Sequence, residues 1–415
     1  MDTVRSHVSY GFKYGPLRFP VILHTENFVA NGIVMWAPKR IELEAIPPSA
    51  PFAEPWLKQL VTHEYRHAVQ YGNLHRRFMK WVGYVVGQQA GLLSSVLLPI
   101  WFLEGDAVMN ETQMASFGRA LQPSFTIEYR AYLTEGTKKF PLDKWFCGSY
   151  KNYIPDHYQF GYQLAAWSRE QYGDDMWSRV AEYGSKYPYT ILTTKWALHK
   201  YYRTSVNEIA RNTLDELTRF WRSLPVEPNS GETLPTPITS YTVYDAPMAL
   251  NDTTLLALKR DMDKSRVVAV DPRTGCERRL FWTGSVNTPP VLYDSTLYWT
   301  EYRSSTLWEQ RVTSRACSYD LRTGRRRTLR ERGKTLFPTP LPDGRLRLCG
   351  ALQPRSGRRK AFRFSGYPFD TRTRLRRGHR NAGRDCARRR GDVDPADRLT
   401  GRSSADDQGA DLCEP

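Results

Sequence analysis

The sequence lacks the signatures of several common classes of protein. Its six cysteines are scattered and none stands in a C-x-x-C pair, which argues against a cysteine metal site and against a dense disulfide framework. There is no zinc-finger or RNA-binding signature and no basic helix interleaved with aromatic residues, so specific nucleic-acid binding is not expected. Residues Met1–His7 contain no basic region followed by an apolar run, so the chain as given carries no secretory signal.

Acidic residues are also scarce relative to basic ones, and the net charge is +17. Part of this excess lies in residues 351–415, which carry 16 basic against 9 acidic side chains and few large apolar residues. The charge therefore predicts no more than nonspecific contact with polyanions. With 415 residues and 40% apolar content, the chain is long enough for two folded domains.

The first half of the sequence predicts a small sheet followed by helices. Alternation of apolar and polar residues indicates strands at Phe19–Thr25 and Ile33–Ala45, which we expect to form an antiparallel sheet. Ser205 and Glu208 predict a capping box at the start of the last helix. Helical spacing predicts helices at Pro55–Tyr71, from Pro99 onward, and at about 156–172, 175–183, 192–202 and 206–223.

The second half predicts an incomplete β-propeller. Leu224–Ser240 is rich in Pro, Ser, Thr and Gly and predicts a linker between a domain at 1–223 and β-rich repeats at 241–350. In these repeats Asp271–Gly275 (DPRTG) recurs 49 residues later as Asp320–Gly324 (DLRTG). A period near 50 is typical of propeller blades, but only about two and a half repeats fit, whereas closure needs about four to eight.

The arginine-rich residues 351–415 show no strand pattern. Two interpretations remain for them. They form a disordered tail, or they result from a shifted reading frame that replaces the missing blades. The second is favoured because it also explains why the repeat is interrupted.

The most informative motif is a pair of histidines at helical spacing. His63 and His67 flank Glu64 in HEYRH, and four residues make about one helical turn, so both imidazoles can reach one cation. With 8 histidines in 415 residues, chance would produce H-E-x-x-H in about one chain in a hundred. The motif therefore favours a metal site over two unrelated surface histidines.

A third ligand is expected on the following helix. Glu104 comes after a wholly apolar segment in Trp101–Gly105 (WFLEG). A buried carboxylate needs a partner, and a divalent metal ion is one of the few adequate partners. Glu111, further along the same helix, is the competing ligand.

HEYRH followed by PIWFLEG resembles the gluzincin peptidases of the thermolysin-like fold, over about Phe19–Phe220. The resemblance implies a mostly helical α+β zincin-like domain that binds one Zn²⁺ per chain through His63, His67 and Glu104. The later repeats resemble the WD40-like propellers found beside such domains in bacterial periplasmic proteins. This implies a periplasmic or cell-envelope location.

One feature departs from the family pattern. The 36 residues between His67 and Glu104 exceed the usual spacing. The inserted residues Trp81–Leu98 form either a helical hairpin over the site or a contact with a membrane. Glu111 lacks the W-x-x-E-G context, so Glu104 remains the preferred ligand.

The uncharged run Trp81–Leu103, which includes this insertion, is 23 residues long and could span a membrane by length alone. Three glycines and Pro99 break it, however, which predicts shorter helices buried in the protein. A spanning helix would also separate His63 from Glu104 across the bilayer. We therefore expect no membrane span here and keep a spanning or membrane-dipping segment as the alternative.

The expected chemistry is peptide-bond hydrolysis. Two neutral imidazoles and one carboxylate leave a fourth tetrahedral position for water, whose pKa zinc lowers to about 7. Glu64 cannot easily bind the same ion from the adjacent helical position. It is therefore expected to act as the general base and to pass the proton to the leaving amine.

The tetrahedral intermediate needs a hydrogen-bond donor for its oxyanion. The resemblance implies a donor on a later helix, where Tyr158 and His157 are the candidates. Tyr162 is the fallback, and aromatic core packing is the alternative for all three. The resemblance also implies that an extended peptide pairs with an edge strand. Asn31–Trp36 is the candidate strand, with an ordinary hairpin as the alternative.

A rival hypothesis is a binding or scaffold protein. In that case the propeller would bind protein partners and the peptidase domain would be a remnant. The intact Glu64 argues against this hypothesis, because a scaffold has no use for a general base. The expected partner is therefore a peptide or protein substrate.

Overall fold

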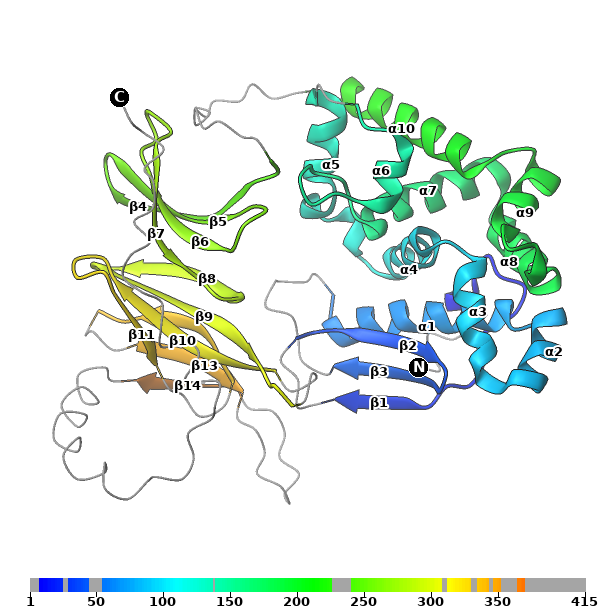
Figure 1. Cartoon of the computed structure of the whole chain (residues 1–415), viewed down its shortest axis with the longest axis horizontal. Coiled ribbons are helices and arrows are strands. Elements are labelled where there is room, and N and C mark those ends of the chain that lie inside the picture. The colour runs from blue at the N-terminus through cyan, green and yellow to red at the C-terminus, as the bar shows by residue number, and fades with distance from the viewer. Residues whose placement is uncertain are drawn as a thin grey trace, which may run out of the picture. The chain divides into compact units, whose positions relative to one another are not determined.

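The computed structural model divides the chain into two compact units, Met1–Asn229 and Ser230–Pro415, and each is described by itself (Figure 1). Helices and β-sheets both occur, in agreement with the predicted α+β class. Most of the predicted linker and of the tail lies outside the described residues. The structure describes residues 7–24, 29–44, 54–136, 139–225, 240–307, 312–329, 334–342, 346–351 and 364–369.

A three-stranded sheet opens the first unit, with the strand order β1-β3-β2. Strands β2 (Gly32–Trp36) and β3 (Lys39–Glu44) form an antiparallel hairpin, but β1 (Val21–His24) runs parallel to β3. The prediction of a wholly antiparallel sheet was therefore wrong, as was the prediction of one strand through Ala45. Pro38 lies in the hairpin turn, where its missing N–H breaks no ladder.

Helix α1 (Trp56–Leu74) covers one face of this sheet. Val34, Ile41 and Leu43 of the sheet share a buried cluster with apolar side chains of α1, among them Leu60 and Val69. The opposite face of α1 contacts α4 (Ile100–Met114), which begins directly after Pro99 as expected. The two histidines of α1 therefore lie between a sheet and a second helix.

The remaining predicted helices appear as α7 (His157–Tyr172), α8 (Met176–Lys186), α9 (Thr193–Tyr202) and α10 (Val206–Ser223). Helix α7 packs directly against α4, and the later helices pack on α7, on α8 or on one another. Ser205 caps α10 by accepting a hydrogen bond from the Glu208 N–H, but the Glu208 side chain accepts from Thr204 instead of completing the box. Sequence analysis did not identify α5 (Pro123–Glu135) or α6 (Leu142–Cys147).

The long uncharged run is divided at Gly87 and Pro99, whereas Gly83 and Gly91 lie inside helices. It forms the end of α2 (Arg77–Val86), a 3-10 turn η3 (Gly87–Gln89), α3 (Ala90–Leu97) and the start of α4. The prediction that the run is buried was wrong for α2, whose Trp81, Tyr84 and Val85 are exposed. Among the helices that the structure describes, none has both the length and the apolar character needed to cross a membrane.

Helices α4 and α7 cross at two glycines. A Cβ on Gly105 would collide with the backbone of Gly161, and one on Gly161 would collide with the carbonyl oxygen of Trp101. Only glycine allows two helix backbones to approach so closely. This crossing brings Glu104, which precedes Gly105, close to Tyr158, which lies one turn before Gly161.

The second unit contains successive antiparallel sheets. The first is β4 (Val243–Asn251), β5 (Thr254–Arg260), β6 (Arg266–Val270) and β7 (Glu277–Trp282), and the second is β8 (Val286–Tyr293), β9 (Thr296–Ser304), β10 (Val312–Asp320) and β11 (Arg325–Leu329). Each joins neighbouring strands in sequence order. Leu256, Leu258 and Val267 of the first pack against Leu297 and Trp299 of the second, so the two sheets meet through apolar faces.

The sequence repeat has a structural counterpart. Asp271–Gly275 and Asp320–Gly324 join the third and fourth strands of their respective sheets. In both turns the aspartate carboxylate accepts a backbone N–H two residues later, and the glycine has a positive φ of 72° or 65°. The repeat thus marks equivalent turns, where glycine is favoured because its φ is positive.

A third sheet contains β12 (Lys334–Pro340), β13 (Leu346–Ala351) and β14 (Phe364–Phe369). Strand β14 lies in the tail, where no strand was predicted. Its sequence FSGYPF is aromatic and free of arginine, which is compatible with a strand. The described residues form no closed barrel or propeller.

Candidate metal centre

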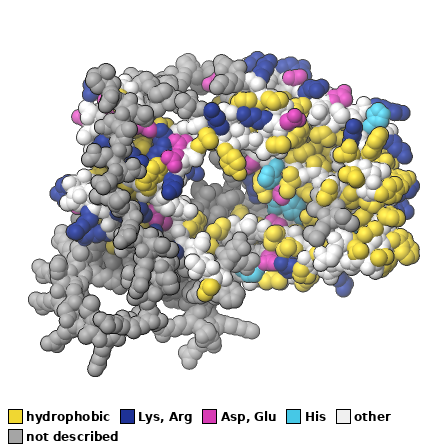
Figure 2. Space-filling view, viewed as in Figure 1, with side chains coloured by type: hydrophobic (Ala, Val, Ile, Leu, Met, Phe, Trp, Pro, Cys, Tyr) yellow, Lys and Arg dark blue, Asp and Glu magenta, His cyan; other side chains and the backbone are white. Residues whose placement is uncertain are grey.

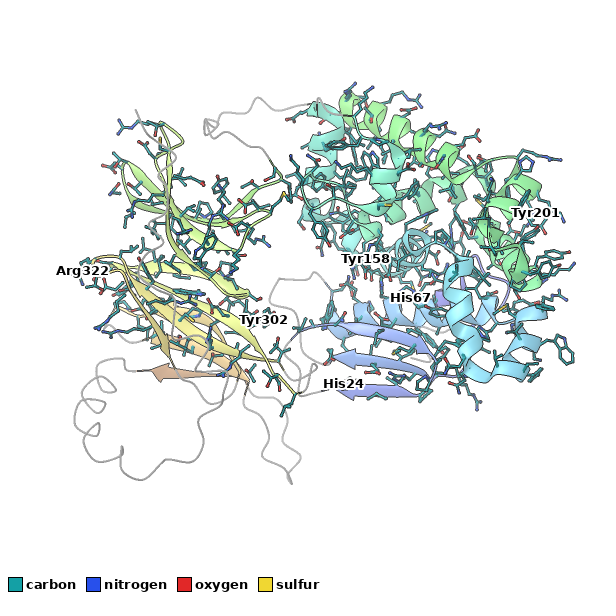
Figure 3. All side chains as sticks on the ribbon, in the orientation of Figure 1. His24, His67, Tyr158, Tyr201, Tyr302 and Arg322 are labelled. Atoms are coloured by element: carbon teal, nitrogen blue, oxygen red, sulfur yellow. The ribbon has the colours of Figure 1, made fainter. Side chains whose placement is uncertain are left out.

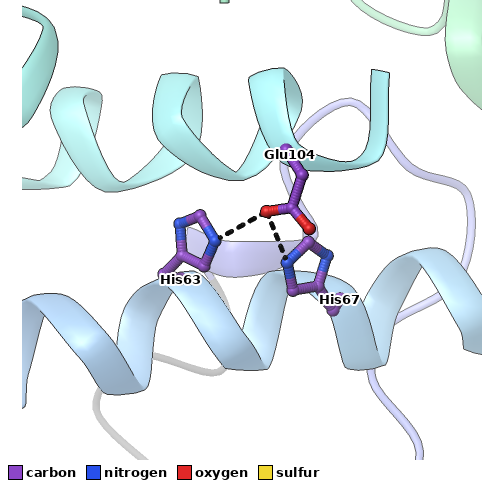
Figure 4. Close-up of side chains that lie close together, drawn as sticks. All are labelled: His63, His67 and Glu104. Carbon is purple, nitrogen blue, oxygen red and sulfur yellow. Dashed lines mark hydrogen bonds and ion pairs between the residues drawn. The ribbon is translucent and has the colours of Figure 1, made fainter. Parts of the chain in front are cut away.

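Two imidazoles and a carboxylate converge between α1 and α4. His63 and His67 lie one turn apart on α1, and Glu104 faces them from α4 (Figure 4). The Oε2 atom of Glu104 is 3.2 Å from Nε2 of His63 and 3.4 Å from Nε2 of His67. One donor atom from each residue lies within 4.8 Å of the others, so the three could hold a metal ion together.

These separations fit a metal site. In a tetrahedral zinc site, bonds of about 2.0–2.2 Å place neighbouring donor atoms about 3.4 Å apart. The distances from Glu104 to the two histidines are close to this value. The donor set, two nitrogens and one oxygen, is also the set that zinc commonly accepts.

Glu111 supports His63 from the other side of the ring. Its Oε2 lies 3.0 Å from Nδ1 of His63, whereas Glu104 lies at Nε2. Gln59 donates a hydrogen bond to Glu111, and Arg119 forms an ion pair with it at 2.8 Å. Glu111 is therefore directed at the nitrogen that faces away from the centre, where a carboxylate orients the imidazole.

Gln70 orients His67 as Glu111 orients His63. Its Oε1 lies 2.8 Å from Nδ1 of His67, while its amide donates to the Leu103 carbonyl and to Asp106. Because Oε1 can only accept, this bond places a proton on Nδ1 and leaves Nε2 directed at Glu104. Both histidines are thus held by buried polar partners.

A buried charge network lies beneath these contacts. Asp106, two residues after Glu104, accepts two hydrogen bonds from Arg66 of α1 and forms an ion pair with Arg169 of α7. Burial opposes the charge of Asp106, but the two guanidinium groups hold its pKa at about 2, below the ordinary value. The network fixes α4 to α1 and to α7 next to the candidate ligands.

Glu64 lies against the edge strand of the sheet. A Cβ added to Gly32 of β2 would come within 2.7 Å of the Glu64 carboxylate. Burial raises the pKa of Glu64, although the neighbouring His67 and His63 act in the opposite direction. The absence of a side chain at position 32 leaves room for this carboxylate.

The same residues line a cavity of about 360 Å³. Its walls include His63, Glu64, His67 and Glu104, and β2 contributes Gly32, Ile33 and Val34, which follow Asn31. Among the described strands, β2 pairs only with β3 and is an edge of the sheet. The predicted edge strand therefore lines the candidate centre.

Of the predicted oxyanion donors, Tyr158 lines this cavity (Figure 3). Its ring centroid lies 6.0 Å from that of His63. Burial, the charge of Glu104 and a hydrogen bond to Glu104 raise the pKa of Tyr158, so its hydroxyl stays protonated. His157 is exposed beside Tyr158, and Tyr162 packs on Phe125; neither belongs to the cavity lining.

Arg119 and Tyr71 also line the cavity, and sequence analysis did not identify either. The guanidinium of Arg119 lies 5.7 Å from the ring centroid of Tyr158. Arg119 reaches the site from a 3-10 turn after α4. The sequence around it contains no motif, so its position in the site could not be predicted. The lining includes none of the described residues of α2 and α3.

The carboxylates beside His63 and His67 favour positive charge at the centre. Burial opposes a charge on His63, but its hydrogen bonds to Glu104 and Glu111 raise its pKa to about 10. Burial likewise opposes ionisation of Glu104, yet the charge of His67 and hydrogen bonds to both imidazoles lower its pKa. The site thus favours positive charge next to Glu104, which a divalent cation would also supply.

Comparison with known proteins yields no match to a family model, to a curated protein or to a solved structure.

Proposed function

We propose that the chain is a zinc-dependent metallopeptidase that hydrolyses peptide bonds, with His63, His67 and Glu104 as metal ligands. The observation that carries this proposal is the convergence of two histidines and one glutamate at distances that suit a tetrahedral zinc ion. Zinc bound there would lower the pKa of a water molecule and polarise a carbonyl group.

The residues around the centre have separate tasks in this proposal. Glu64 lines the cavity beside the histidines, and its raised pKa suits a base that accepts a proton and then donates it to the leaving amine. The Tyr158 hydroxyl, kept protonated, would donate a hydrogen bond to the oxyanion. The edge strand β2 would pair with an extended peptide through the backbone groups on its outer edge.

Metal content tests the ligand assignment without a known substrate. Protein purified in the presence of zinc should contain one zinc per chain. His63→Ala, His67→Ala and Glu104→Ala should each lose most of it, because each removes a ligand. Glu64→Gln should keep the metal.

Hydrolysis of unstructured protein substrates tests the chemistry. Glu64→Gln should lower the rate by about a hundredfold or more, as the loss of a general base does. Tyr158→Phe should lower the rate about 10²- to 10³-fold, as the loss of one oxyanion donor does, with metal content unchanged. Metal in the wild type without any hydrolysis would favour the scaffold hypothesis, and loss of zinc from Glu64→Gln would overturn the assigned roles.

A further inference from the structure

A second feature of the first unit lies outside the cavity. Helix α2 presents Phe78, Trp81, Tyr84 and Val85 to solvent, and Trp81 and Val85 are 70% and 84% exposed. Met79 on the other side of α2 is fully buried. An amphipathic helix usually turns its apolar side inward, so apolar side chains on the outer side need another explanation.

The exposed surface continues onto neighbouring segments. The ring of Phe78 lies 6.0 Å from that of Tyr189, in the loop between α8 and α9. Ile191 and Leu192 follow in this loop and are 72% and 56% exposed. Figure 2 shows hydrophobic side chains gathered on the side of the unit that carries α2 and α3.

The loop is joined to α3 as well. Thr193 and Thr194 donate hydrogen bonds to the carbonyl oxygen of Leu97, and Val96 beside it is 68% exposed. The exposed residues of α2, of the loop at 189–192 and of the end of α3 thus form one surface, which we name the apolar face.

The charged residues in the segments that form the apolar face are basic. Residues 76–103 and 183–207 contain seven Lys and Arg residues and no Asp or Glu. Lys80 lies 5.8 Å from the ring centroid of Tyr84, and Lys195 lies 6.0 Å from that of Trp196. Glu182, at the border of the face, forms ion pairs with Arg77 and Lys13. An apolar centre with a basic rim matches an anionic surface.

We propose that the apolar face docks the protein on an anionic lipid bilayer, with its exposed apolar side chains in the interface and its basic residues at the headgroups. Trp and Tyr prefer the interface between membrane and water, and this face carries Trp81, Tyr84 and Tyr189. Basic amphipathic helices such as α2 lie in this plane. A second copy of the chain is a poorer partner, because it would bring two basic rims together.

Vesicle flotation with the full chain tests the proposal. Binding is measured to vesicles of phosphatidylcholine alone and of phosphatidylcholine mixed with phosphatidylglycerol, at low and high salt. The protein should float with the mixed vesicles, and high salt should weaken binding because it screens the attraction to lipid headgroups. The double variant Lys80→Glu/Lys195→Glu should weaken binding at least fivefold per residue, since each basic side chain contributes about 1 kcal/mol.

Trp81→Ser/Val85→Ser tests the apolar contribution and should weaken binding roughly tenfold or more. Ile127→Ser is the matched control, because Ile127 on α5 is 60% exposed but lies outside the apolar face. It should bind like the wild type. Circular dichroism checks that all variants are folded, and the charge variant remains informative if the serine variant does not fold.

Three outcomes would overturn the proposal. They are absence of binding to the mixed vesicles, equal binding by wild type and by both sets of variants, and a dimer in light scattering that Trp81→Ser/Val85→Ser converts to a monomer. The last result would assign the apolar face to self-association. None of these readouts requires metal or hydrolysis, so the outcome is independent of the proposed peptidase activity.

Discussion

At the scale of single residues, the role of Glu111 depends on which nitrogen of the His63 ring it contacts. It faces Nδ1 of His63, while Glu104 faces Nε2. Glu111→Gln should therefore lower zinc affinity about 10- to 100-fold, the range for loss of a carboxylate that orients a ligand. Competition with a fluorescent chelator measures this affinity.

The zinc affinity of Glu111→Gln is compared with that of Glu104→Ala, which should lose zinc binding altogether. Glu170→Gln on the exposed side of α7 is the control and should bind zinc like the wild type. Equal losses for the Glu111 and Glu104 variants would make Glu111 a ligand as well.

The lowered pKa of Asp106 predicts that the stability of the fold decreases at acidic pH. Because the folded pKa of about 2 lies below the ordinary value of about 3.9, the group stabilises the fold above pH 4. That contribution, about 2–3 kcal/mol, should be lost as the pH falls from about 4 to about 2. Urea unfolding at a series of pH values, followed by the helical circular dichroism signal, measures it.

Asp106→Asn separates this effect from general acid unfolding. It leaves Arg66 and Arg169 buried without their counter-charge, so stability at neutral pH should fall by about 3–5 kcal/mol. Its loss of stability between pH 4 and 2 should be smaller than that of the wild type. Parallel pH profiles for the two proteins would contradict the role of Asp106.

At the scale of elements, the crossing of α4 and α7 decides where Glu104 and Tyr158 lie. Gly161→Ala would drive a methyl group into the Trp101 carbonyl. We expect a loss of about 1–3 kcal/mol of folding stability, as for other overpacked contacts, and weaker zinc binding because α4 is displaced. Thermal unfolding and chelator competition measure the two effects.

Gly83→Ala on α2 is the matched control for this substitution. An added Cβ there has no neighbour within 4 Å among the described atoms. Alanine should raise stability by up to about 1 kcal/mol through its better helix propensity. Equal effects of the two substitutions would mean that helix propensity, and not the crossing, governs Gly161.

Local signals in the sequence located most helices but not the pairing of strands. Pro99 and Ser205 mark where α4 and α10 begin, because capping depends on a few adjacent residues. The direction of β1 relative to β3 depends instead on a contact between distant segments, and alternation cannot specify it. Helix α5 carries Phe125, Tyr129 and Tyr132 at helical spacing, so its signal was present and was overlooked. Helix α6 has six residues and is too short to show a period.

In the candidate site too, the sequence predicts what adjacent residues determine and does not predict contacts between distant segments. His63, Glu64 and His67 follow from a single turn of helix, so the sequence alone could identify them. Glu104 was preferred over Glu111 because it follows an apolar segment and stands in the W-x-x-E-G pattern. The contacts of Glu111, Gln70 and Arg119 could not be predicted, because they depend on how α1, α4 and the turn after α4 pack together.

At the scale of the whole molecule, the division into two units predicts independent folding of the first. All described helices and all candidate ligands lie within it. The fragment Met1–Ser230 should therefore fold and bind one zinc ion. Its thermal midpoint should differ from that of the helical signal in the full chain by less than about 3 °C, or about 1 kcal/mol.

Calorimetry and zinc analysis of the fragment check this expectation. The complementary fragment, residues 231–415, should bind no zinc and should show a sheet signal. A first fragment that aggregates while the full chain is folded would show that the first unit depends on the second.

The bond between Arg66 and Asp106 also bears on how related chains could be found. Arg66 occupies one of the two variable positions of H-E-x-x-H, and Asp106 stands two residues after the third ligand. Loss of either partner leaves a buried charge, so selection should keep or replace the two together. A search that requires H-E-x-R-H with E-x-D on the next helix would reject most chance occurrences of the shorter motif. It would also find relatives whose overall sequence has diverged.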